Sequence, residues 1–204
     1  MARFTGSRLK IVRRFGQHLP GLTRKSAENR PYPPGQHGLG RRPKPSDYRI
    51  RLEEKQKFRL NYGLSERQLR SYFKKASGAK GDTGQNLLQL VESRLDNVVF
   101  RAGYAPTIPA ARQLVRHGHV LINGKKLDVP SYKMRLNDVI GLREKSKNNA
   151  MYQENFGAPT LEIPTYLARD DSKFEATYTA TPTRDDIPLE IQENLIVEHY
   201  SRVA

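Results

Sequence analysis

Positive charge is concentrated in two separate stretches of this sequence. Residues 1–75 contain 20 Lys and Arg against 5 acidic residues, and residues 94–147 contain 11 against 4. From residue 148 to the end, 10 acidic residues outnumber 4 basic ones. Stretches this cationic repel themselves unless a polyanion neutralises them. The fold is therefore expected to present both stretches to a polyanion, because an evenly solvated surface would mix the two signs of charge.

The rest of the composition favours nucleic acid over a membrane surface as that polyanion. The longest apolar runs are too short to cross a bilayer, and no signal segment opens the chain. Only 36% of the 204 residues are hydrophobic, which is low for a free-standing enzyme of this length. With no cysteine, disulfides and thiolate metal sites are excluded. No Gly-rich phosphate loop or nucleophile–base pair stands out, so neither a cofactor nor a catalytic residue is expected.

Residues 1–45 are expected to form a loop-rich basic arm. Pro20-Gly21 and Pro33-Pro34-Gly35 interrupt any helix, and the apolar residues show no sustained period. Such a segment cannot bury enough surface to order itself, so we expect it to fold against RNA. Apolar residues such as Ile11 and Leu19 argue against a simple disordered tail.

A helical domain is expected over residues 46–93. Its second helix should begin at the capping box formed by Ser65 and Gln68, and its third should be interrupted near Glu92. A stripe of apolar residues at helical spacing predicts a last helix over about 187–202 that completes this domain.

Residues 94–154 are expected to form a small module inserted into the helical domain, followed by a variable segment and the last helix over 155–204. Thr107 can cap a helix that Gly118 ends. The strand that follows runs into Asn123-Gly124, a strong hairpin signal. Further strands are expected near Val129, at 132–134 and at 138–142. The predicted fold class is α+β, with two short helices packed on a small, mostly antiparallel sheet in the module.

Several motifs resemble the family of small ribosomal subunit protein four. The module motifs are Arg94-Leu95-Asp96-Asn97, Ala111-Arg112-Gln113-Leu114-Val115, His117-Gly118-His119 and Asn123-Gly124-Lys125. Outside the module, Pro34-Gly35-Gln36-His37-Gly38, Ser46-Asp47-Tyr48 and the run from Leu195 to Arg202 resemble the same family. Many members carry an N-terminal cysteine cluster that binds a metal. Here His18 and His37 alone cannot supply four ligands, so no metal is expected.

The resemblance implies a primary binder of small-subunit ribosomal RNA that nucleates assembly of the subunit body, in a cytoplasmic or plastid ribosome. It also implies contacts with neighbouring ribosomal proteins that influence decoding accuracy. Arg41, Arg42, Lys44 and Arg49 would lie near the path by which messenger RNA enters the subunit.

The expected RNA contacts come from both basic stretches. In the first they are Arg3, Arg8, Lys10, Arg13, Arg14, Arg41, Arg42, Lys44, Arg49, Lys55 and Lys57. In the module they are Arg94, Arg101, Arg112, Arg116, His117, His119, Asn123, Lys125, Lys126, Ser131 and Tyr132. Arg112 and Arg116 lie four residues apart on one expected helix. With Lys125 they are predicted to form an exposed clamp on an RNA phosphate, so replacing both should leave the fold intact.

Two other functions are open at this point. Related modules are appended to some pseudouridine synthases and tyrosyl-transfer-RNA synthetases, and Arg94-Leu95-Asp96 mimics a pseudouridine synthase active site. A helix-start role for Asp96, or pairing with a residue such as Arg101, explains the same motif, and no catalytic domain is left over. A DNA-binding or ribosome-associated regulatory protein is the second alternative, and a salt-dependent comparison of duplex DNA with structured RNA would separate it.

Overall fold

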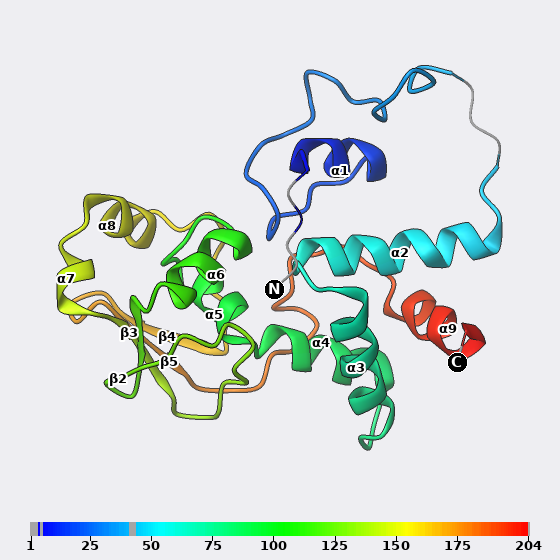
Figure 1. Ribbon diagram of the computed structural model, residues 1–204. Helices are drawn as coiled ribbons and strands as arrows, with labels where there is room; N and C mark the ends of the chain where they lie inside the picture. Colours follow the sequence, from blue (N-terminus) through cyan, green and yellow to red (C-terminus); the bar gives the residue numbers. More distant parts are fainter. Residues whose placement is uncertain (1–3, 5, 41–43, 204) are drawn as a thin grey trace.

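A lobe of helices forms one half of the chain in the computed structural model, which describes residues 4, 6–40 and 44–203. Helices α2 (Asp47–Asn61), α3 (Glu66–Ser77), α4 (Thr83–Glu92) and α9 (Glu193–Val203) build this lobe (Figure 1). The capping box predicted at Ser65 and Gln68 is confirmed at the start of α3. The predicted interruption near Glu92 is also confirmed, since α4 ends there. Helix α9 packs along α2 and also contacts α3 and α4, so the two ends of the sequence share one core.

The segment before α9 differs from the prediction of a helix over about 187–202. The helix begins only at Glu193. Ile187, Leu189 and Ile191 are each buried from a non-helical segment, and their two-residue spacing is that of an extended chain. The Arg184 guanidinium holds this segment by donating to the carbonyl oxygens of all three residues, at 3.2–3.3 Å.

The N-terminal arm also departs from its prediction, because it contains helix α1 (Arg8–Phe15). Gly16 ends this helix at a φ of 64°, and its N–H donates to the Val12 carbonyl. Ile11, Val12, Leu19 and Leu22 are buried in the common core. The arm is fastened to the helical lobe where the Gly21 N–H donates to the Asn61 side chain at 2.9 Å. The sequence pattern did not predict this helix because four apolar contacts, rather than a long periodic stripe, stabilise it.

The other lobe is an antiparallel sheet in the order β2-β1-β3-β5-β4. Its strands are β1 (Val120–Ile122), β2 (Lys125–Lys126), β3 (Val139–Leu142), β4 (Leu167–Asp170) and β5 (Glu175–Tyr178). The hairpin predicted at Asn123 and Gly124 is confirmed, with φ angles of 50° and 77°. Strands expected near Val129 and at 132–134 are absent from the described structure, apart from a single bridge between Arg94 and Lys133.

Two strands come from the segment that was expected to be variable. Strand β5 pairs with β3 in the register Ile140 to Ala176, and β4 pairs with β5. The module therefore extends beyond the expected boundary at 154, because the edge of β3 is covered by a hairpin from 167–178.

Among the described residues, four helices complete the module: two precede β1 in the sequence, and two follow β3. They are α5 (Leu95–Arg101), α6 (Ile108–Arg116), α7 (Glu144–Lys147) and α8 (Ala150–Gly157). The Thr107 side chain caps α6 as predicted. Tyr104 fixes the sheet to the residues after α5 by donating to the carbonyl oxygens of Ile140 and Phe174, at 3.1 and 3.0 Å. No helix in the described ranges is both long and apolar enough to cross a membrane.

Candidate nucleic-acid interface

Exposed cations of the N-terminal stretch lie on α1 and at the start of α2. Arg8, Lys10 and Arg14 point into solvent from α1, and Lys44 is exposed just before α2. Arg49 is also exposed, and it pairs with Glu53 one helical turn on at 2.8 Å. Such a pair on an open surface contributes little stability, so it can be exchanged for a phosphate. Arg3, Arg41 and Arg42 lie outside the described residues.

Arg13 stabilises the arm itself. Its guanidinium donates to the carbonyl oxygens of Arg30 and Tyr32, at 3.2 and 3.0 Å. The same group lies 4.9 Å from the centre of the Tyr32 ring, a cation–π contact. Arg13 therefore fixes the chain after α1, and its neighbour Arg14 is the one that faces solvent.

Lys55 and Lys57 have protein partners on or near α2. Lys55 is buried, and its ammonium donates to Glu66 at 2.9 Å. That hydrogen bond and one from Tyr200 lower the pKa of Glu66, although partial burial opposes the shift. Lys57 pairs with Glu54. The expectation that Lys55 contacts RNA is corrected, since its ammonium is buried and already paired with Glu66.

The expectation that Arg94 and Arg101 contact RNA is also corrected. Both are buried, at 2% and 5% exposure. Arg94 makes two hydrogen bonds to Asp96, at 3.0 and 2.7 Å, and a third to the Tyr72 hydroxyl. Arg101 donates to the carbonyl oxygen of Asp186 at 2.6 Å. A guanidinium buried with internal acceptors is too costly to unpair for an RNA contact.

Arg112 is not the exposed clamp that its spacing suggested. It donates twice to Asp96, at 2.9 and 2.6 Å, and to the carbonyl oxygens of Gly63 and Tyr62 at 2.7 and 3.1 Å. Its side chain thus ties α6 to the turn between α2 and α3. Asp96 pairs with Arg94 and Arg112, where Arg101 had been the suggested partner.

The module retains exposed polar and basic groups at the end of α6 and on the β1–β2 hairpin. Arg116, His117, Asn123, Lys125 and Lys126 are all exposed there. The amide of Asn123 donates to Asp138 and accepts from the Val139 N–H, each at 2.9 Å. These bonds fix the turn that presents the two lysines.

His119 lies half-buried between α6 and β1. One ring nitrogen lies 2.9 Å from the Ser146 hydroxyl. Burial, and then electrostatic interaction with His117 and Arg143, lower the pKa of His119. The ring is therefore neutral at pH 7 and can offer a hydrogen bond but no charge. Arg143 and Lys145 are also exposed here, and the sequence reasoning missed them although they belong to the same basic stretch.

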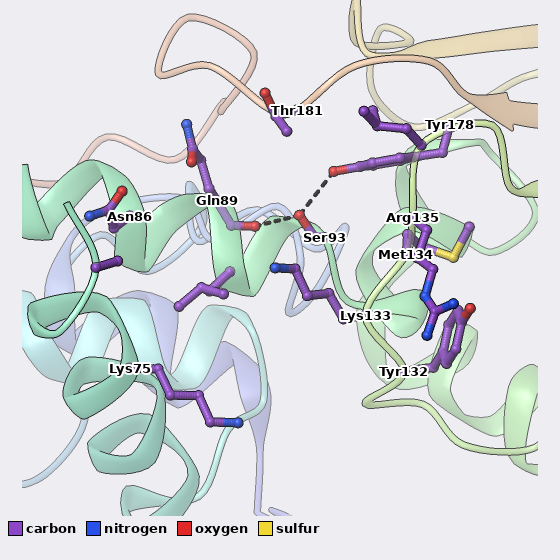
Figure 2. Close-up of a pocket in the computed structure, with 13 residues that line it drawn as sticks. Lys75, Asn86, Gln89, Ser93, Tyr132, Lys133, Met134, Arg135, Tyr178 and Thr181 are labelled. Atoms are coloured by element: carbon purple, nitrogen blue, oxygen red, sulfur yellow. Dashed lines mark hydrogen bonds between the residues drawn. The ribbon is translucent and has the colours of Figure 1, made fainter. Parts of the chain in front are cut away.

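A groove of about 700 Å³ runs between the two lobes. Figure 2 shows Lys75 on its helical side and Lys133, Arg135 and Tyr132 on its module side. Of these, only Tyr132 was expected to bind RNA, and its neighbour Ser131 is half-buried. Burial, and then the charge of Asp138, raise the pKa of Tyr132, whose hydroxyl donates to that carboxylate at 3.3 Å. The three cations were missed because residues far apart in sequence build the groove.

Known protein families match the sequences of both lobes. A family described as ribosomal protein S4/S9 N-terminal domain matches residues 3–92, and the S4 domain matches residues 93–140. The chain is 56% identical over 203 residues to the small ribosomal subunit protein uS4 of Synechococcus elongatus, with 99% of each chain covered. It is 54% identical to the protein of the same name from Parasynechococcus marenigrum, also at 99% coverage of each. A Picosynechococcus relative of that name covers the whole chain at 54% identity, so the similarity includes residues 148–186.

Proposed function

The chain belongs to the ribosomal protein S4 family, and from this premise we propose that it is a structural component of the small ribosomal subunit that binds small-subunit ribosomal RNA. The observation that carries the proposal is identity of 56% over 99% of both chains with a protein named for that subunit. The exposed cations on α1, at the start of α2 and on the module give the physical means, since Lys and Arg neutralise phosphates.

The chain is a ribosomal protein and not an enzyme. The relatives that it matches over 99–100% of their length are named as proteins of the small ribosomal subunit. Asp96, the residue that mimics a pseudouridine synthase aspartate, is fully buried and holds two arginines. Those ion pairs account for the Arg-Leu-Asp motif without any reaction.

The proposal extends to assembly and decoding. A protein that grips RNA through both lobes can hold separate RNA segments together, which is how a primary binder would nucleate the subunit body. Lys44 and Arg49 leave their charges exposed at the start of α2, and we place messenger RNA near them. We propose that neighbouring ribosomal proteins contact the surface that RNA does not cover.

Purified ribosomes test the proposal. The chain, carrying an affinity tag, would be expressed in Synechococcus elongatus, and the subunits would be separated by sedimentation. We expect the tagged protein in small subunits at one copy each, in competition with the resident relative. Recovery only as free protein, or equally with the large subunit, would overturn the proposal.

A further inference from the structure

The groove between the lobes combines an apolar interior with a cationic rim. Ala79 and Leu90 line it from the helical side, and Met134 and Leu136 line it from the module. Lys75, Lys133 and Arg135 stand around it and are exposed. No acidic residue is among the residues described as lining it. The groove therefore offers apolar surface and positive charge together.

The rim cations are free to bind a ligand. Within the described ranges, none of Lys75, Lys133 and Arg135 forms an ion pair, in contrast to Lys55 and Lys57. Three uncompensated charges around one opening attract a polyanion and repel a basic protein segment. Charge complementarity therefore selects the occupant.

The interior is suited to a flat, largely apolar group with polar edges. Leu136 is 56% exposed and Met134 is 3% exposed, so one wall is accessible at its top and packed at its base. Gln89 on α4 is one of the polar residues that line the groove (Figure 2). A volume of about 700 Å³ lies in the range of roughly 300–1,000 Å³ that small-molecule sites occupy. An unstacked RNA base is such a group, because it is flat and largely apolar on its faces and carries polar atoms at its edges.

We propose that this groove receives an unpaired, unstacked nucleotide of the bound ribosomal RNA, an inference that rests on the proposed function. The base enters between Leu90 and Leu136, where the Gln89 amide can bond its edge. The flanking phosphates lie on Lys75, Lys133 and Arg135. Because these groups come from both lobes, such a nucleotide can be bound only when the lobes hold their present arrangement.

Filling the groove without changing its charge tests the inference. Thr181 lines the groove and is exposed, so Thr181→Trp would occupy the space intended for the base. Ala180→Trp is the matched control, since Ala180 is exposed and is not among the lining residues. Binding to a small-subunit ribosomal RNA transcript is measured at one salt concentration. We expect Thr181→Trp to weaken binding roughly tenfold and Ala180→Trp to leave it unchanged.

A second pair of variants keeps the test decisive if Thr181→Trp fails to fold. Ala79→Trp fills the groove from the opposite wall, and circular dichroism checks the fold of each protein. The triple variant Lys75→Gln, Lys133→Gln, Arg135→Gln should bind more weakly and lower the salt slope by about two.

The outcomes separate this inference from the proposed function. If the unaltered chain does not bind the transcript, the proposed function fails. If it binds and both folded tryptophan variants bind equally well, the nucleotide site is overturned. Loss of affinity only in the triple variant also overturns it, because the RNA backbone then crosses the rim without inserting a base.

Discussion

Asp96 joins three parts of the chain at a single buried carboxylate. It accepts hydrogen bonds from Arg94 before α5 and from Arg112 on α6. Through Arg112 the network reaches the backbone carbonyls of the α2–α3 turn. Electrostatic attraction inside a protein is stronger than in water, and so is the penalty for leaving one member unpaired. These residues therefore stabilise the junction between the lobes.

Arg112→Ala should destabilise the protein because it leaves Asp96 with one arginine and two backbone carbonyls with no donor. We expect a loss of about 2–4 kcal/mol in the free energy of unfolding, measured by urea denaturation at pH 7. Arg116→Ala, on the exposed side of the same helix, is the matched control and should change stability by less than about 0.5 kcal/mol. Equal, small effects of the two substitutions would show that Arg112 is a surface residue after all.

Helix α9 completes the helical lobe through a few specific contacts. The Tyr200 hydroxyl donates to Glu66 at 2.8 Å, and Arg51 on α2 pairs with Glu198 at 3.3 Å. His199 is buried between these contacts, with its ring 5.9 Å from that of Tyr48. Burial, and then the positive charge of Lys55, lower the pKa of His199. Its neutral form is therefore the one that suits the packed helix.

Acid should loosen the packing of α9 on α2. A histidine whose pKa is lowered on folding binds protons more readily when unfolded, so its contribution is present above the unfolded pKa of about 6.5 and is lost as pH falls through the lower folded pKa. We expect His199→Gln to reduce the fall in unfolding free energy between pH 7.5 and pH 5, measured by urea denaturation at the two pH values. An unchanged pH dependence in this variant would contradict the assignment. The pH dependence of the His119→Gln variant, which changes a histidine of the other lobe, is measured for comparison.

Elements set by local chemistry could be predicted from the sequence, whereas those set by distant contacts could not. The Ser65 capping box, the Thr107 cap and the Asn123-Gly124 turn each depend on residues within one turn of chain. Helix α1 depends on core contacts, and β5 depends on pairing with β3 across more than thirty residues. The same limit applies to the interface. Exposure of Arg116 and burial of Arg101 follow from packing, which composition does not record.

At the scale of the whole molecule, the basic residues divide into exposed cations and groups held in internal pairs. The net charge is +15, although buried or paired groups such as Arg94, Lys55 and Arg112 neutralise the carboxylates of Asp96 and Glu66. The cations left exposed lie on both lobes, and several acidic residues after position 147 serve local structure. Asp186, for example, accepts from Thr165 and Thr183, and these hydrogen bonds lower its pKa against the opposing effect of burial.

The most direct test of the account is the affinity for ribosomal RNA as a function of salt. The dissociation constant of the full chain would be measured for small-subunit and large-subunit ribosomal RNA at several salt concentrations. We predict tighter binding to the small-subunit RNA, with an affinity that falls steeply as salt rises because each phosphate contact adds about 0.7–0.9 to the log–log slope. A slope near zero, or equal affinity for the two RNAs, would contradict it.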